Sequence, residues 1–254
     1  MTALLIDDRI VQCAEGATVL QAARSAQIPI PTLCHHPALE SSGACRLCTV
    51  AVRRPGRDWQ LAASCMLPVE EGMQVKTGTD EVLQARRVIA ELLLARCPDT
   101  PRVRELARSL GVESSDFEPP AKHTDCVLCG LCTRACDRVG FSAISLVDRG
   151  VSRRVAPPLD RPPADCVGCL ACAQVCPTGA IPFQVLDDSV VIWDRHFELL
   201  RCKSCGAAIM TRAQAAALGS RIGLQEADAA LCDGCKRKRT AASIAAVASM
   251  RAVP

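Results

Sequence analysis

Two cysteine runs between residues 126 and 176 constrain this sequence more than any other feature. Each run has the spacing C-x2-C-x2-C-x3-C, and the second is followed directly by Pro177. The first run consists of Cys126, Cys129, Cys132 and Cys136, and the second of Cys166, Cys169, Cys172 and Cys176. Three thiolates on one tight loop can cap three irons of a cubane, but the same loop cannot supply the fourth. The spacing therefore predicts two [4Fe–4S] clusters rather than a zinc site or a disulfide framework.

The two runs resemble those of bacterial two-cluster ferredoxins, in which the fourth cysteine of each run ligates the other cluster. The resemblance implies one cluster on Cys126, Cys129, Cys132 and Cys176, and the other on Cys166, Cys169, Cys172 and Cys136. Crossed ligation would hold the two clusters close together, as electron hopping requires.

Cysteine usage across the whole chain points to several small metal-bound modules. The chain has 18 cysteines in 254 residues, and almost all of them fall in pairs or runs with ligand spacing. Modules below about 40 residues usually need metals or disulfides to be stable. We therefore expect folding to be coupled to metal insertion. Thiol-rich metal sites without a secretion signal favour a reducing cytoplasm.

The N-terminal segment, residues 1–78, contains a second kind of cysteine pattern. Its four cysteines are separated by gaps of ten, two and sixteen residues: Cys34, Cys45, Cys48 and Cys65. An apolar hairpin around Asp7 and Asp8 precedes them, followed by a short helix that begins with a capping box of Thr18 and Gln21. Hairpin, helix and cysteine loop together predict a β-grasp domain that binds a [2Fe–2S] cluster. Cys13 lies in a strand pattern and is interpreted as a small buried hydrophobe.

Short phrases of the sequence resemble known iron–sulfur subunits. The long first gap and the phrase GACRLCTV at residues 43–50 resemble the N-terminal domain of the large iron–sulfur subunit of NADH–quinone oxidoreductase. Residues 125–132, 147–150, 155–157 and 176–180 resemble iron-only hydrogenases and the diaphorase small subunit of NAD-linked hydrogenases. The stretch after Ala180 is too short for a hydrogenase catalytic domain, so we expect the hydrogen-activating site to be missing.

Residues 79–120 are expected to form a helical linker. In the NADH–quinone oxidoreductase relatives, the corresponding helix leads to a further [4Fe–4S] site made by one histidine and three cysteines. Between residues 96 and 125, this sequence offers only Cys97 and His123 as candidate ligands. We therefore expect that the cluster is missing here, and interpret Cys97 as a buried thiol.

The C-terminal segment, residues 196–254, contains two C-x2-C hooks. They consist of Cys202, Cys205, Cys232 and Cys235. Four thiolates suit a closed, tetrahedral structural zinc site, so the pattern favours a zinc-ribbon-like module; a single rubredoxin-like iron is the alternative. The basic run at residues 236–239 is interpreted as a solvated face or a docking contact for an acidic partner, rather than a nucleic-acid patch. Residues 240–250 are expected to be helical.

These patterns predict an α+β chain with four parts: a β-grasp [2Fe–2S] ferredoxin domain (1–78), a helical linker (79–120), a 2[4Fe–4S] ferredoxin domain (121–195) and a zinc-ribbon-like module with a C-terminal helix (196–254). No dinucleotide fingerprint, P-loop or recognisable nucleophile–base pair is present, so no catalytic residue is expected. A net charge of +3 is too small to indicate a nucleic-acid partner, and no apolar run is long enough for a membrane span.

The resemblance implies an electron-transfer subunit of a cytoplasmic, hetero-oligomeric oxidoreductase. Electrons would pass between a flavin- and NAD(P)H-binding subunit and a catalytic subunit, such as a hydrogenase or a formate dehydrogenase, in a direction that the sequence leaves open. Two alternatives remain: an iron–sulfur sensor that binds nucleic acid through its zinc ribbon, and a diffusible ferredoxin. Three clusters in series argue against a sensor, which needs only one.

Overall fold

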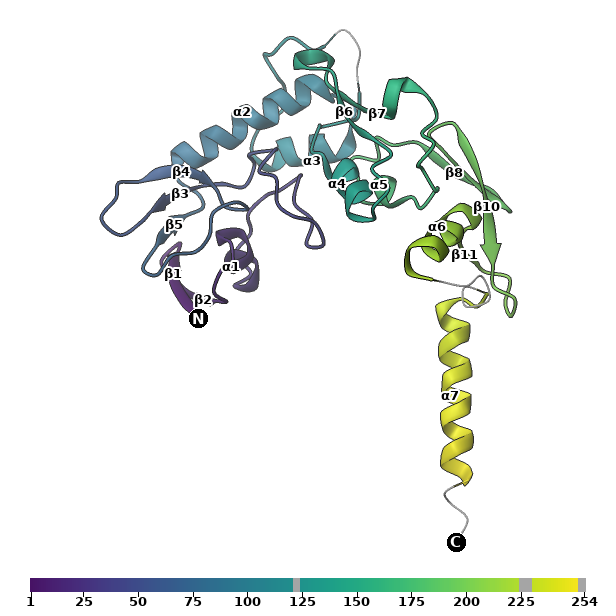
Figure 1. Ribbon diagram of the computed structural model, residues 1–254. Coiled ribbons are helices and arrows are strands. Elements are labelled where there is room, and N and C mark those ends of the chain that lie inside the picture. Colours follow the sequence, from purple (N-terminus) through teal and green to yellow (C-terminus); the bar gives the residue numbers. More distant parts are fainter. Residues whose placement is uncertain (121–123, 224–229, 251–254) are drawn as a thin grey trace. The chain divides into compact units, whose positions relative to one another are not determined.

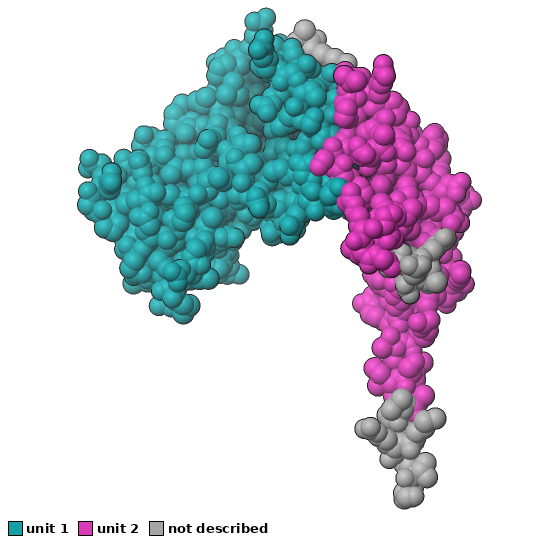
Figure 2. Space-filling view, viewed as in Figure 1, with its two compact units in different colours: residues 1–140, 144–156, 172–181 teal, residues 141–143, 157–171, 182–254 magenta. Residues whose placement is uncertain are grey.

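The computed structural model describes residues 1–120, 124–223 and 230–250, and for the side chains it ends at residue 246. The chain forms two compact units, coloured separately in Figure 2. Unit 1 comprises residues 1–140, 144–156 and 172–181, and unit 2 comprises residues 141–143, 157–171 and 182–254. His123, a candidate ligand in the sequence, lies outside the described residues.

Unit 1 contains a five-stranded mixed sheet with the order β2-β1-β5-β3-β4. The strands are β1 (Thr2–Ile6), β2 (Arg9–Cys13), β3 (Thr49–Arg53), β4 (Gln60–Ala63) and β5 (Gln74–Lys76). β1 pairs with β5 in parallel and with β2 as an antiparallel hairpin. The hairpin turn has positive φ at Asp7 (47°) and Asp8 (66°), as a type I′ turn requires. The predicted N-terminal hairpin is confirmed.

Helix α1 (Val19–Ser25) covers this sheet and begins with the predicted capping box. The backbone N–H of Gln21 donates to the Thr18 hydroxyl at 3.3 Å, and the Thr18 N–H donates to the Gln21 side-chain oxygen at 2.8 Å. The buried face of α1 joins Leu4, Ile6 and the central valines of β3 and β5 in one apolar core. Two of the first four candidate ligands, Cys48 and Cys65, belong to this core and are therefore fixed against the sheet.

Two helices follow the sheet in unit 1 (Figure 1). Helix α2 (Asp80–Arg96) begins at the N-cap Thr79 and packs on β3, and α3 (Pro101–Ser109) packs back on α2. Pro98 and Pro101 separate the two helices because proline cannot continue a helix interior. Gly111, with φ of 74°, then takes the left-handed conformation common after a helix end. The helical character that the sequence predicted for residues 79–120 is confirmed by α2 and α3.

The rest of unit 1 surrounds the first cysteine run. Helix α4 (Leu131–Arg138) contains the third and fourth cysteines of that run. A short antiparallel hairpin, β6 (Ser145–Val147) and β7 (Arg154–Ala156), follows, with the 3-10 turn η1 (Gly150–Ser152) between its strands. The 3-10 turn η2 (Pro158–Asp160) precedes the second run, whose third cysteine, Cys172, lies in the short helix α5 (Ala171–Gln174).

Unit 2 is built on a four-stranded antiparallel sheet with the order β11-β10-β9-β8. Its strands are β8 (Phe183–Val185), β9 (Ser189–Ile192), β10 (Arg195–Arg201) and β11 (Ala208–Thr211). Trp193 and Asp194, with φ of 54° and 57°, make the tight turn between β9 and β10. Helix α6 (Arg212–Ile222) follows β11, and its N-cap Thr211 accepts from the Gln214 N–H at 3.0 Å.

The C-terminal helix α7 spans Asp233–Met250 and extends away from the rest of unit 2 (Figure 1). It begins seven residues earlier than the sequence indicated, so the basic run at 236–239 lies on the helix. The physical reason is that lysine and arginine are good helix formers, while Asp233 favours the first turn of a helix. Within the described part of the chain, no helix has the length and apolar character needed to cross a bilayer.

Candidate metal centres

The four cysteines of the N-terminal pattern come together in unit 1, three from the segment before β3 and the fourth from the turn after β4. Cys34, Cys48 and Cys65 are each 1% exposed, and Cys45 is half-buried. The Cys45 thiol donates to Cys34, which lowers the pKa of Cys34 to about 5. The Cys65 thiol likewise donates to Cys48, which lowers the pKa of Cys48 to about 6.

Backbone around these thiols is turned toward them. The Cys45 N–H donates to the Cys34 sulfur at 3.4 Å. Gly43 and Arg46 have positive φ of 63° and 58°, which bends the chain around the sulfurs. Three buried thiols and one half-buried thiol, with a backbone N–H directed at the Cys34 sulfur, are a donor set that suits a [2Fe–2S] cluster. The residues therefore fit the expected group.

Cys13 is separate from this loop. It lies at the end of β2, is 8% exposed, and its thiol donates to the Thr2 carbonyl at 3.5 Å. It packs in the apolar core of the sheet, in agreement with the interpretation of a small buried hydrophobe.

The first cysteine run gathers around α4, and Cys176 is close to it. Burial raises the pKa of Cys132 to about 12, and the negative charges of Cys129, Cys126 and Cys176 add to this increase. Burial also raises the pKa of Cys129, with Cys176 as the first charge that adds to the effect. The Ala180 N–H donates to the Cys176 sulfur at 3.3 Å. These are the four thiols expected to hold one [4Fe–4S] cluster.

The other expected ligand set draws on both units. Cys166 and Cys169 belong to unit 2, whereas Cys136 and Cys172 belong to unit 1. That set therefore stays a prediction.

The two runs share a local backbone pattern. In each, the second and fourth residues after the first cysteine have positive φ: Leu128 (53°) and Gly130 (69°) in the first run, Gly168 (68°) and Leu170 (60°) in the second. Alternating left-handed residues turn successive backbone N–H groups toward one concave side, where they favour bound anions. The runs are thus equivalent in backbone conformation as well as in cysteine spacing.

Arginines hold the cysteine loops through their backbone carbonyl groups, a feature that the sequence did not reveal. Arg96 donates to the Cys126 carbonyl at 2.9 Å, and Arg195 donates to the Cys166 carbonyl at 2.9 Å. The first cysteine of each run is therefore fixed by an arginine from outside that run.

The N-terminal loop has an arginine of its own. Arg86 of α2 is 5% exposed and donates to the carbonyl groups of Leu47, at 3.0 Å, and Thr49, at 2.8 Å. These two residues flank Cys48. Arg134 of α4 contacts both the N-terminal loop and the first run, through the Cys34 and Cys129 carbonyl groups. The only sequence signal for it is its position inside a ligand run.

The C-terminal cysteines form a compact group in unit 2. The sulfurs of Cys202, Cys205, Cys232 and Cys235 all lie within 4.8 Å of one another. The Cys205 and Cys232 sulfurs are 3.7 Å apart, and four thiolates at about 2.3 Å from a tetrahedral ion would be separated by about 3.8 Å. Backbone N–H donation, first from Cys232, lowers the pKa of Cys202 to about 6. The group fits one tetrahedral metal ion.

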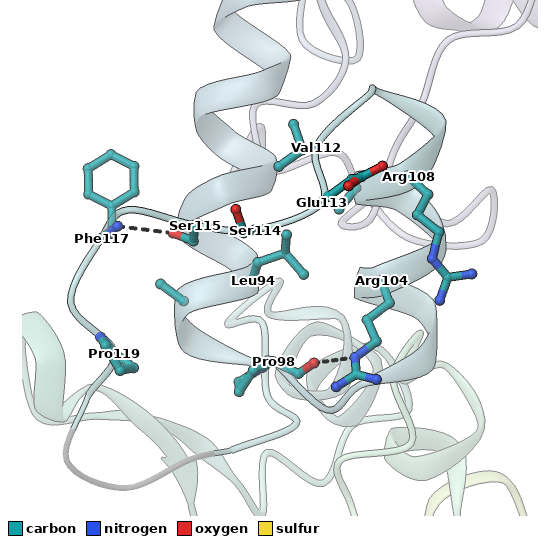
Figure 3. Close-up of a pocket in the computed structure, with 12 residues that line it drawn as sticks. Leu94, Pro98, Arg104, Arg108, Val112, Glu113, Ser114, Ser115, Phe117 and Pro119 are labelled. Carbon is teal, nitrogen blue, oxygen red and sulfur yellow. Dashed lines mark hydrogen bonds between the residues drawn. The ribbon is translucent and has the colours of Figure 1, made fainter.

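The segment between the ferredoxin-type parts contains a buried thiol and a cavity. Cys97 is fully buried, and burial raises its pKa to about 11; the nearby Thr100 hydroxyl donates to Asp125 at 2.6 Å. A cavity of about 490 Å³ lies between α2, α3 and residues 113–119 (Figure 3). Its lining includes Leu94 and Phe117 but neither cysteine nor histidine, so it offers no soft metal ligand.

Comparison with known proteins agrees with a [2Fe–2S] site in the N-terminal segment and [4Fe–4S] sites at the two cysteine runs. Residues 1–80 match the family model of a 2Fe-2S iron–sulfur cluster binding domain, and residues 125–180 match that of a 4Fe-4S dicluster domain. A solved structure of NAD⁺-reducing [NiFe]-hydrogenase in the H2-reduced state contains a similar chain: 32% identity, a TM-score of 0.55, 62% of this chain and 75% of that chain covered. This chain belongs to the iron–sulfur subunit family of NAD(P)-linked hydrogenases and NADH–quinone oxidoreductases.

Two curated proteins are similar to this chain over part of their length. The chain is 34% identical over 212 residues to NADP-reducing hydrogenase subunit HndD of Solidesulfovibrio fructosivorans, covering 71% of this chain and 36% of that protein. It is 32% identical over 176 residues to the 75 kDa subunit of NADH-ubiquinone oxidoreductase from Reclinomonas americana, covering 59% of this chain and 25% of that protein. The chain thus spans about a third or less of these relatives' length. The expected [2Fe–2S] and [4Fe–4S] ferredoxin-type domains, of mixed α and β structure, are confirmed.

Proposed function

We propose that this chain relays electrons between a flavin- and NAD(P)H-binding subunit and a catalytic oxidoreductase subunit, such as a hydrogenase or a formate dehydrogenase, in the cytoplasm. The observation that carries the proposal is the direct packing of two cluster loops in unit 1. Cys34 of the N-terminal loop and Cys129 of the first run, 1% and 7% exposed, lie in one apolar cluster with Leu131. Two redox centres whose loops share buried apolar packing suit electron transfer rather than substrate chemistry.

Four centres are proposed for the chain. A β-grasp domain over residues 1–78, supported by the order of its five strands, would hold one [2Fe–2S] cluster on Cys34, Cys45, Cys48 and Cys65. The domain over residues 121–195 would hold two [4Fe–4S] clusters with crossed ligands, supported for one cluster by the proximity of Cys176 to Cys129 and Cys132. The four C-terminal cysteines would hold a structural zinc ion in the zinc-ribbon-like module over residues 196–254. Residues 79–120 would link the domains without a cluster.

The protein residues have defined tasks in such a relay. The clusters, when bound, supply one-electron transfer. The thiolates hold them, and the buried surroundings exclude water. The N–H groups of Cys45 and Ala180, directed at the sulfurs of Cys34 and Cys176, stabilise the negative charge there. We propose no active site of its own among the residues that the structure describes.

Zinc is proposed for the C-terminal group because its sulfurs are spaced for a single ion. A cubane would need a wider cage, since four irons and four sulfides must fit inside the thiolates. Cys205 is exposed, whereas three of the four N-terminal ligands are buried and the fourth, Cys45, is half-buried. A structural role at the base of α7 suits this position, and α7 itself carries an exposed basic run at 236–239 that suits an acidic partner.

Metal and sulfide analysis of the anaerobically purified chain tests the proposal. The expected result is about ten iron, about ten sulfide and about one zinc per chain. Iron near about fourteen would mean a third cubane and would overturn the assignment of residues 79–120. Anaerobic affinity isolation tests the partners. Stable subunits that carry flavin or a catalytic metal support a relay, an isolated chain supports a diffusible ferredoxin, and salt-sensitive nucleic-acid binding supports a sensor.

A further inference from the structure

The side chain of Arg134 contacts the backbone of two different cluster loops. Arg134 lies in α4, between Cys132 and Cys136 of the first run. Its Nη2 donates to the Cys34 carbonyl at 2.7 Å and to the Cys129 carbonyl at 3.4 Å. Cys34 is a proposed [2Fe–2S] ligand and Cys129 a proposed [4Fe–4S] ligand. One guanidinium group thus joins loops that are separated by about a hundred residues of sequence.

Further contacts fix the position of this guanidinium group. Its Nε donates at 3.2 Å to the carbonyl of Gly130, the N-cap of α4, and its Nη1 donates to the Glu40 carbonyl in the N-terminal loop. Arginine presents five N–H donors in one rigid plane, so it can serve several carbonyl groups at once. Lysine has a single ammonium point and cannot reproduce this arrangement.

The contacts of Arg134 lie in partly buried surroundings, where hydrogen bonds and charges act more strongly than they do in water. Cys34 and Cys129 pack with Leu131 in an apolar cluster, and an unpaired carbonyl group among them would be costly. Arg134 is itself half-buried. A positive charge that is partly removed from water acts on its neighbours with less screening than a charge at the surface.

We infer that Arg134 is a positioning residue that holds the [2Fe–2S] loop against the loop of the first-run [4Fe–4S] cluster, and that its positive charge raises the reduction potential of both clusters. The inference rests on the proposed function, because it needs both clusters. A nearby cation favours the reduced form of each cluster, which carries one more negative charge than the oxidised form. Because both clusters share the cation, both potentials move in the same direction.

Replacement of Arg134 by glutamine, with Arg138→Gln as the matched control, tests the charge. Arg138 is exposed at the end of the same helix, so both variants lose one positive charge from α4. The measurement is an EPR-monitored redox titration of the cluster-loaded full chain. Arg134→Gln is expected to lower the potentials of the [2Fe–2S] cluster and of one [4Fe–4S] cluster, and to shift the other [4Fe–4S] cluster less. Arg138→Gln is expected to leave all three near the wild-type values.

Microwave power saturation of the [2Fe–2S] signal tests the positioning. A nearby paramagnetic [4Fe–4S] cluster accelerates relaxation of that signal, and the acceleration falls as the loops separate. Arg134→Lys keeps the charge but loses the multiple contacts. It should therefore keep both potentials near wild type while weakening the relaxation enhancement. If Arg134→Gln retains no iron, the iron content of Arg134→Lys decides: joint loss of the two neighbouring clusters supports the inference, and loss of only one overturns it.

Two results would overturn the inference while leaving the proposed function intact. In one, the wild-type chain shows all three clusters and Arg134→Gln matches Arg138→Gln in both potentials and in relaxation. In the other, only one of the two neighbouring clusters responds to Arg134→Gln. A wild-type chain without iron–sulfur signals would overturn the proposed function as well.

Discussion

Substitution of Gly168 by alanine should destabilise the second cysteine run specifically. Gly168 lies between Cys166 and Cys169 with φ of +68°. A Cβ at this position would lie 2.6 Å from two ring carbons of Phe197, whose side chain is 4% exposed in the core of unit 2. Arg195 restrains the Phe197 ring, because it stacks on the ring at 4.8 Å and also holds the Cys166 carbonyl. The variant therefore combines backbone strain with a steric clash.

The two effects can be estimated separately. A left-handed conformation costs a residue other than glycine about 1–2 kcal/mol. Forcing an extra methyl group into a packed core costs about 1–3 kcal/mol. The total of about 2–5 kcal/mol corresponds to a roughly 30-fold to several-thousand-fold increase in the opened state of the loop, at about 1.4 kcal/mol per factor of ten. Gly179→Ala is the matched control, because Gly179 has φ of +67° but no atom within 4 Å of its Cβ position.

The assay is the anaerobic rate of iron release to a colorimetric chelator at fixed urea concentration. When opening is fast relative to capture, this rate follows the population of the opened loop. Gly168→Ala should produce a fast phase of about four irons, about 5- to 150-fold faster than the corresponding phase of Gly179→Ala. Phe197→Ala should relieve the clash, so the double variant should lose less stability than the two single variants together. Equal rates for Gly168→Ala and Gly179→Ala, or fully additive effects in the double variant, would refute the steric argument.

Three further predictions concern ligands and the groups that support them. Cys176→Ser should damage the [4Fe–4S] cluster held mainly by the first run and spare the cluster of its own run; EPR showing the reverse would refute crossed ligation. Arg86→Ala should accelerate loss of the [2Fe–2S] cluster by removing two buried hydrogen bonds, each worth about 1–3 kcal/mol to a charged donor, whereas the exposed Arg87→Ala should change it little. Equal bleaching rates of the [2Fe–2S] absorption in these two variants would contradict that role. Cys205→Ser should release zinc and keep all iron, with Cys13→Ser unchanged in both, as measured by elemental analysis; loss of about four irons instead would assign a cluster to the C-terminal group.

Features encoded by neighbouring residues could be predicted from the sequence. The capping box of Thr18 and Gln21 and the turn at Asp7 and Asp8 involve residues at most three positions apart, so their chemistry is readable directly. The cysteine runs are equally local, because a metal cluster fixes the spacing of its ligands regardless of the surrounding fold. The C-terminal cysteines come together as their spacing indicated, although the distance between their two hooks is 26 residues.

Features that depend on long-range contacts could not be predicted. Arg134 and Cys34 are 100 positions apart, and nothing in either neighbourhood indicates that they meet. The sheet of unit 2 also gave little signal, since β8 has only three residues, all of them exposed, and so lacks the apolar alternation of a half-buried strand. The early start of α7 was obscured by the metal-binding hook of Cys232 and Cys235, because the last three residues of that hook form the first residues of the helix.

The account depends most on the claim that this chain conducts electrons through several clusters. Reductive titration of the anaerobically purified full chain, followed by EPR, measures this directly by counting the electrons that each molecule accepts. The account predicts about three electrons per chain, one in a [2Fe–2S] signal and two in [4Fe–4S] signals. A metal-replete chain that accepts no electrons, or that shows only one reducible centre, would contradict it.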